Sequence, residues 1–374
     1  MRRQRLLLDA RRRINSGVGR VSQWLTNKLA PNLDEYADVT HVSLPGTRRE
    51  YQLEGRVVLE TDIAPFSSGE FTDLPKLIDG AGFDLYINPN ATWSPLHRTP
   101  TINMVHDLWT VEHGEWLPSE PELGLRFGLS DVSYTARLVE WFEARDIADY
   151  LSPEGQSMWA RGHGSGVSPL YCASLAQFAA VVRHSAAIVV VAEPLRERIK
   201  RYFTSADRVF TIHNVPTEWR ASGNRGRCHF LALAKIEPRK NLAMLLDAYG
   251  QYADSLRDRA LPLVIAGDAG YAACATEFNA RVDAMRAGGM DVRFVESASD
   301  EQLAVLLRDA AAVVNTSLSE SFGLPVLEAM LAGVPVISTA TGVLAWDLQE
   351  HAVLVNPDDP AGLCDRLVRV TFKG

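Results

Sequence analysis

The stretch SLSESFGLPVLEAMLAGVPVIS (residues 317–338) joins two apolar runs through a short loop and a helical pattern. The run before it ends at Asn315, and the run after it starts at Val334. Pro325 suits the first turn of the expected helix, and Gly333 suits its C-terminal end. Runs that are apolar throughout are typical of strands buried on both faces. The stretch therefore predicts a strand–helix–strand unit of a parallel sheet.

The same alternation of apolar runs and helical segments extends along the chain in both directions. Ser299 and Gln302 have the spacing of a capping box at the start of one such helix. The strands expected in the C-terminal half are CHFLALA (228–234), PLVIAG (262–267), DVRFV (291–295), AAVVN (311–315), VPVIS (334–338) and AVLV (352–355). Those expected in the N-terminal half are RLLLD (5–9), RVVLE (56–60), FDLYIN (83–88), TINMV (101–105), AIVVVA (187–192) and RVFTI (208–212). A helical and loop-rich insertion is expected between residues 110 and 184.

This pattern predicts an α/β fold with two Rossmann-like, doubly wound domains. The length of 374 residues agrees with two domains. The polar stretch TEWRASGNRGR (217–227) is the expected linker, so the domains are predicted at 1–216 and 228–374. Ligands bind at the carboxyl ends of the strands in such folds, and we expect the two domains to face each other across a cleft.

Composition restricts the class of function. The net charge of −8 argues against a nucleic-acid-binding protein. The four cysteines are far apart and the chain has no long apolar run, so we expect a cytoplasmic protein. The arginines that crowd the N-terminus are Arg2, Arg3, Arg5, Arg11, Arg12, Arg13 and Arg20. They would either face anionic lipid or a phosphorylated acceptor, as a peripheral contact at the inner membrane surface, or form solvated charge around the first strand, which we favour.

The loop and first helical turn after Asn315 have the features of an anion site. The amides of Phe322, Gly323 and Leu324 lie at the expected N-terminus of the helix, where phosphate binds well. Glu320 precedes this turn and Glu328 follows it, and carboxylates accept hydrogen bonds from sugar and ribose hydroxyls. The alternative is that both glutamates only stabilise the helix N-terminus.

A second cluster follows the first strand of the C-terminal half, in AKIEPRKN (234–241). Lys235, Arg239 and Lys240 lie at the expected carboxyl end of this strand, where they would balance the charge of a diphosphate. The alternative is a solvated loop in which Asn241 caps the next helix.

These motifs make the region from about 228 to 365 resemble the donor domain of the retaining glycosyltransferases of family 4 (glycosyl transferases group 1), which have the GT-B fold. The segment ESFGLPVLEAM (320–330) matches the family's pair of glutamates, and Ala234-Lys235 with Lys240 matches its Gly-Arg and lysine. GVPVIS and NPDDP match further downstream motifs. Two departures are Ser321 for glycine and Lys235 for arginine, which loses the bidentate fork.

The resemblance also assigns residues in the N-terminal half. Gly17 and Gly19 match a glycine-rich segment whose amides line the diphosphate side of the site, although an ordinary loop pair is the alternative. A dinucleotide fingerprint would need a third glycine where Ser22 stands, so an oxidoreductase is disfavoured. His106 matches a histidine that reaches the donor sugar, and the alternative is a loop histidine beside a capping Asp107.

The resemblance implies transfer of a sugar with retained configuration and without a metal or other cofactor. Glu320, His106 and Lys240 would be the catalytic residues. The motif wording resembles the mannosyltransferase-like branch, so GDP-mannose is the first expected donor and a UDP-hexose the second. The acceptor would be a glycan or lipid-linked sugar, as in polysaccharide biosynthesis. The alternatives are a non-catalytic nucleotide-sugar-binding scaffold or a sugar-nucleotide epimerase on the same fold.

Overall fold

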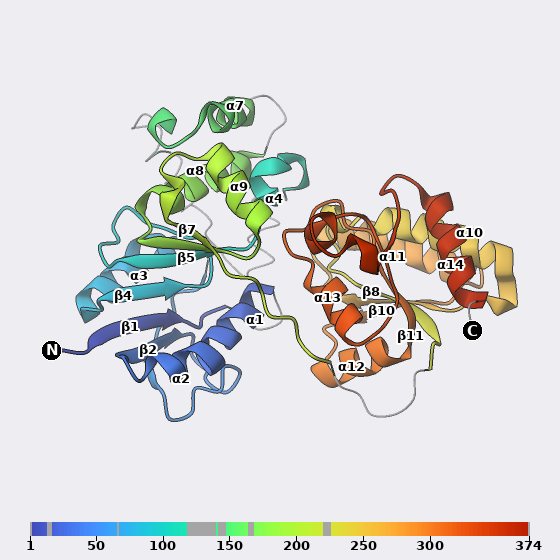
Figure 1. Ribbon diagram of the computed structural model, residues 1–374, viewed down its shortest axis with the longest axis horizontal. Coiled ribbons are helices and arrows are strands. Elements are labelled where there is room, and N and C mark those ends of the chain that lie inside the picture. Colours follow the sequence, from blue (N-terminus) through green and yellow to red (C-terminus); the bar gives the residue numbers. More distant parts are fainter. Residues whose placement is uncertain are drawn as a thin grey trace. The chain divides into compact units, whose positions relative to one another are not determined.

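The computed structural model describes residues 2–12, 17–65, 67–117, 140, 147–163, 168–219 and 226–372. The chain forms two compact units, Met1–His213 and Asn214–Gly374. Each unit contains one parallel sheet with flanking helices (Figure 1), which confirms the predicted pair of Rossmann-like α/β domains. The boundary predicted at residue 216 lies just beyond the end of the first unit, and residues 220–225 of the predicted linker lie outside the described residues.

The N-terminal sheet has the strand order β3-β2-β1-β4-β5-β6-β7. Its strands are β1 Gln4–Asp9, β2 Ala37–Ser43, β3 Val57–Glu60, β4 Leu85–Asn88, β5 Thr101–Val105, β6 Ala187–Val190 and β7 Val209–Thr211. Successive side chains of β1 point to opposite faces, so Leu6 and Leu8 belong to one core cluster and Leu7 to another. All of these strands except β2 were expected from the sequence.

Helices form most of the connections between the strands of this unit. They are α1 Gly17–Trp24, α2 Ala30–Leu33, α3 Ser68–Ala81, α4 Trp109–Glu112, α7 Pro153–Gly162, α8 Pro169–His184 and α9 Glu193–Tyr202. A π-helical segment, Leu25–Leu29, connects α1 to α2. The described part of the predicted insertion is helical in α7 and α8, as expected.

The C-terminal sheet has the order β10-β9-β8-β11-β12-β13. Its strands are β8 His229–Leu233, β9 Leu263–Gly267, β10 Val292–Glu296, β11 Ala310–Asn315, β12 Val336–Ser338 and β13 Val353–Leu354. Its helices are α10 Leu242–Leu256, α11 Ala272–Ala287, α12 Asp300–Asp309, α13 Leu324–Leu331 and α14 Pro360–Phe372. Phe230 packs in the core cluster that includes α10 and α14, whereas Leu231 packs in the cluster that includes α13. Both faces of this sheet are therefore covered.

The two sheets repeat one topology around their first strands. In both, the chain adds two strands on one side of the first strand and then crosses to the other side, where β4 pairs with β1 and β11 pairs with β8. The strand order reverses at this point, and open α/β sheets bind ligands at the carboxyl ends of the strands there. In the C-terminal unit, the loops after β8 and β11 are therefore the place to look for a site.

The arginines near the N-terminus are engaged within the chain. The Arg11 side chain is fully buried, with Nη2 2.6 Å from an Asp9 carboxylate oxygen and 3.0 Å from Glu70. Arg12 is also buried and lies 3.0 Å from the same Glu70 oxygen. Closer to the chain start, Arg2 pairs with Asp84 and Arg3 with Asp38. The prediction of solvated charge is therefore wrong for Arg11 and Arg12, because buried carboxylates balance them. Arg13 lies outside the described residues.

Among the described helices, none combines the length and the apolar composition that crossing a bilayer requires.

Candidate functional site

The loop after β8 is held in place by the loop after β9. The Ile236 amide donates to the Asp268 carbonyl at 3.0 Å. A Cβ atom on Gly267 would lie 2.1 Å from the Ala234 carbonyl oxygen, and one on Gly270 would lie 1.7 Å from that of Ile236. Only glycine permits this approach, so the segment from Ala234 onward has a fixed path toward Arg239 and Lys240.

The loops after β8 and β11 are joined by hydrogen bonds. The Thr316 hydroxyl donates to the Lys240 carbonyl at 2.9 Å, and the Leu318 amide donates to the Arg239 carbonyl at 2.7 Å. The Ser317 carbonyl accepts from the Thr339 hydroxyl at 2.5 Å. The first two bonds join the β8 and β11 loops, and the third ties the β11 loop to the residue that follows β12.

Arg239, Lys240 and Glu320 form a charged cluster at this point, as the sequence predicted for their strand ends. Lys240 Nζ pairs with Glu320 Oε1, and Arg239 Nη1 lies 3.1 Å from Glu320 Oε2. The other guanidinium arm, Nη2, lies 2.8 Å from Glu237 Oε1. The Lys240 and Glu320 side chains are 8% and 11% exposed and Arg239 is 19% exposed, so the cluster is shielded but reachable.

The charges of this cluster depend on one another. Burial alone would raise the pKa of Glu320, but the neighbouring cations Lys240 and Arg239 outweigh burial and lower it to about 2. Burial lowers the pKa of Lys240, and the Glu320 carboxylate opposes this shift. Glu320 is therefore ionised at neutral pH, and the cluster holds an anion against two cations.

Helix α13 begins beside this cluster with Gly323 in the left-handed region, at φ 88°. A Cβ atom there would meet no other atom within 4 Å, so glycine is needed for its conformation and not for packing. The preceding Phe322 carbonyl accepts from the Val343 amide at 2.8 Å, which fixes the turn. Pro325 lies in the first turn and Gly333 follows the helix with φ 64°, as predicted. Pro325 has no amide hydrogen and the Val326 amide donates to the Gly323 carbonyl at 3.0 Å, so within this turn Leu324 supplies the amide that has no acceptor inside the helix.

Two other predicted residues of this unit lie outside the charged cluster. Glu328 is 2% exposed, and its Oε1 accepts from the Thr217 amide at 3.3 Å. Lys235 is partly exposed at the end of β8, without an acidic partner at ion-pair distance among the described residues. Asn241 does not cap α10 with its side chain, which instead donates to the Pro357 carbonyl at 2.9 Å. The roles predicted for Glu328 and Lys235 stay predictions.

The predicted residues of the N-terminal unit follow β1 and β5. Gly17 and Gly19 lie in the first turn of α1, so the expected loop is a helix start, tied to β1 by the Ser22 hydroxyl, which donates to the Asp9 carbonyl at 3.1 Å. His106 follows β5, and its Nε2 lies 2.7 Å from the Pro89 carbonyl oxygen. Burial lowers the pKa of His106, so the ring is neutral at pH 7 and Nε2 donates this bond.

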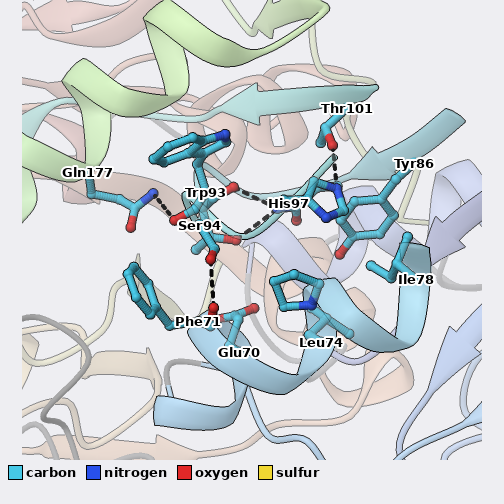
Figure 2. Close-up of a pocket in the computed structure, with 13 residues that line it drawn as sticks. Glu70, Phe71, Leu74, Ile78, Tyr86, Trp93, Ser94, His97, Thr101 and Gln177 are labelled. Carbon is cyan, nitrogen blue, oxygen red and sulfur yellow. Dashed lines mark hydrogen bonds between the residues drawn. The ribbon is translucent and has the colours of Figure 1, made fainter. Parts of the chain in front are cut away.

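The N-terminal unit also contains a small cavity of about 30 Å³ between α3 and the β4–β5 connection. Figure 2 shows His97 against Thr101, with Nε2 2.8 Å from the hydroxyl oxygen, and Ser94 donating to the Phe71 carbonyl at 2.6 Å. None of the residues predicted for the site lines this cavity. A space of this size holds about one or two water molecules, so it does not replace the charged cluster as the candidate site.

The sequence did not identify two residues that complete the cluster. Ser317 donates to Glu320 Oε1 at 2.8 Å, and Glu237 holds one arm of Arg239. Both are polar residues in the loops that follow buried strands, at the carboxyl edge of the sheet. Their position after these strands is the sequence feature from which they could have been predicted.

Comparison with known proteins gives a family match for the C-terminal unit. Residues 227–371 match the family model described as "Glycosyl transferases group 1". A D-inositol 3-phosphate glycosyltransferase of Streptomyces scabiei is 29% identical over 71% of this chain and 59% of its own length. The O-antigen chain mannosyltransferase B of Escherichia coli is 32% identical over 34% of this chain and 33% of its own length. The chain thus spans less than two thirds of each of these relatives.

The fold of the whole chain also has known counterparts. The structure of Anabaena Alr3699/HepE in complex with UDP and glucose aligns with a TM-score of 0.62, at 16% identity, over 99% of this chain and 90% of that one. The chain therefore has the predicted two-domain GT-B fold, and residues 227–371 match the glycosyl transferases group 1 model.

Proposed function

We propose that this chain is a glycosyltransferase that transfers a sugar from a nucleotide-sugar donor to a glycan or lipid-linked acceptor, with retention of configuration and without a metal. The observation that carries this proposal is the cluster of Arg239, Lys240 and Glu320 beside the N-terminus of α13. Cations and the N-terminus of a helix suit a diphosphate, and a carboxylate next to them suits the hydroxyls of the attached sugar.

The proposed reaction breaks the bond between the anomeric carbon and the diphosphate oxygen, and the bonding electrons leave with the diphosphate. The acceptor hydroxyl forms the new bond on the same face, and its proton passes to the leaving oxygen. Lys240, Arg239 and the first amides of α13 would stabilise the charge that develops on that oxygen. His106, Gly17 and Gly19 would contribute from the N-terminal unit, and Glu328 would bind the ribose.

The donor is proposed from the relatives. The Escherichia coli relative is a mannosyltransferase, so GDP-mannose is the first candidate. The Anabaena structure contains UDP and glucose, so a UDP-hexose is the second. Names that include D-inositol 3-phosphate and O-antigen chain support a polyol, lipid-linked or glycan acceptor.

A donor panel tests the proposal. The purified chain is incubated with GDP-mannose, UDP-glucose, UDP-galactose, UDP-N-acetylglucosamine or dTDP-rhamnose, and release of free nucleoside diphosphate is followed. We expect release from one donor, and release at least about a hundredfold slower with the Lys240→Ala variant. Conversion of a donor to its epimer would support the epimerase instead. Binding of a donor without any turnover, even with candidate acceptors present, would support the scaffold.

A further inference from the structure

The Glu320 carboxylate is already occupied by donors from its own unit. Oε1 accepts from Lys240 Nζ and from the Ser317 hydroxyl, which lies at 2.8 Å. Oε2 lies 3.1 Å from Arg239 Nη1. A carboxylate has about four acceptor positions, so three of them are filled. In this state Glu320 has little capacity left for the hydroxyls of a sugar.

The same contacts limit the two cations. Lys240 and Arg239 are the groups that the proposed function assigns to the diphosphate, yet both face the Glu320 carboxylate at contact distance. An anion that enters beside them must compete with Glu320, because a partly buried carboxylate neutralises its cations strongly. Binding of the phosphate and binding of the sugar thus both require that the contacts between Glu320 and its two cations change.

We propose that the donor binds by ion-pair exchange: the diphosphate takes Lys240 and Arg239 from Glu320, and the released carboxylate then binds the sugar hydroxyls. This inference rests on the proposed function and adds to it a coupling between the two halves of the donor. By linkage, each half favours binding of the other. After the sugar has left, Glu320 competes again for the cations, which favours release of the nucleoside diphosphate.

Two neighbours suit such an exchange. Glu237 holds Arg239 through Nη2 at 2.8 Å, so the guanidinium stays in place while Nη1 changes partner. Ser317 holds Glu320 Oε1 and is itself fixed by the Thr339 hydroxyl through its carbonyl. The exchange therefore requires rearrangement of side-chain contacts and no movement of the two loops.

Titration calorimetry with UDP and with GDP tests the exchange in the full chain. Glu320→Gln removes the competing anion, so the nucleoside diphosphate that binds the wild type should bind this variant about tenfold more tightly. Glu237→Gln is the matched control, because it removes one negative charge beside Arg239 but none that pairs with Lys240. Its affinity should change less than about threefold. An equal gain in both variants would indicate general electrostatics, and no gain in Glu320→Gln would show that Glu320 does not compete; either result overturns the exchange.

Ser317→Ala provides a second test that leaves every charge in place. It weakens the hold on Glu320 by one hydrogen bond, so the same nucleoside diphosphate should bind about threefold more tightly. An unchanged or lower affinity would overturn the exchange even if Glu320→Gln does not fold. If the wild type binds neither UDP nor GDP, the proposed function fails and the exchange fails with it. Binding that depends on Lys240 but not on Glu320 overturns the exchange alone.

Discussion

The two units place a charged cluster at equivalent positions, after the first strand of sheets with the same topology. The cluster after β1 consists of Asp9, Arg11, Arg12 and Glu70, and the cluster after β8 consists of Glu237, Arg239, Lys240 and Glu320. Arg11 and Asp9 are 0% exposed, whereas Arg239 is 19% exposed. The topology therefore brings charges together at both strand ends, and the two clusters differ in how far solvent reaches them.

Additional hydrogen bonds explain why the β1 cluster is closed. Arg11 Nη1 donates to the Ile63 carbonyl at 3.0 Å, and the Tyr86 hydroxyl donates to Asp9 Oδ2 at 2.5 Å. Burial would raise the pKa of Asp9, but Arg11 and its other partners keep it below its usual value. Contacts within the chain thus enclose Arg11 and Asp9 completely. The β8 cluster lies beside the N-terminus of α13.

The largest expected effect is a loss of stability when the buried β1 cluster loses its central cation. Arg11→Met leaves Asp9 and Glu70 buried without their main cation, so the free energy of unfolding should fall by about 4 kcal/mol. Urea denaturation measures this loss. Arg3→Ala breaks the exposed pair with Asp38 and should cost less than about 1 kcal/mol. Similar losses in both variants would show that burial does not distinguish these pairs.

The next effect is on activity and concerns the β8 cluster. Lys240→Ala removes a cation expected to stabilise the leaving diphosphate, so kcat/KM should fall by roughly a hundredfold or more, about 3 kcal/mol. Steady-state kinetics with the donor found in the panel measures the change. Activity near the wild-type level would remove Lys240 from the site.

The sequence predicted most of the fold because the C-terminal strands are apolar throughout, as expected for strands with helices on both faces. Strand β2 was missed because ADVTHVS interrupts its apolar residues with Asp38, Thr40 and His41, yet His41 is fully buried. Sequence spacing placed Lys240 and Glu320 at one edge of the sheet but could not show that they pair. It also could not show that Glu70 lies beside Arg11, because partners distant in sequence are set by tertiary packing.

The two units should also lose stability in different pH ranges. Burial lowers the pKa of His41 to about 4 from its usual 6.5, so the N-terminal unit should lose about 3 kcal/mol as the pH falls from 6.5 to 4 and the unfolded state takes up the proton. The pKa of Glu320 is about 2 instead of 4.5, so its contribution to the C-terminal unit is lost between pH 4.5 and 2. Hydrogen exchange followed by mass spectrometry resolves the units. His41→Leu should remove the dependence of the N-terminal unit's stability on pH between 6.5 and 4. Glu320→Gln should remove that of the C-terminal unit between pH 4.5 and 2. Unchanged pH profiles would contradict these assignments.

The smallest expected effect compares two glycines in left-handed conformations, Gly323 before α13 and Gly82 after α3, with φ of 88° and 69°. Alanine at either position should cost about 1 kcal/mol of unfolding free energy, because an L side chain is strained in this region. Only Gly323→Ala should also weaken binding of the nucleoside diphosphate, by about threefold, since its methyl group would enter open space beside the first amides of α13. Thermal denaturation and calorimetry measure the two effects separately. Equal affinities in the two variants would mean that the phosphate does not approach the Gly323 turn, and the binding role of the β8 cluster would then rest on its cations alone.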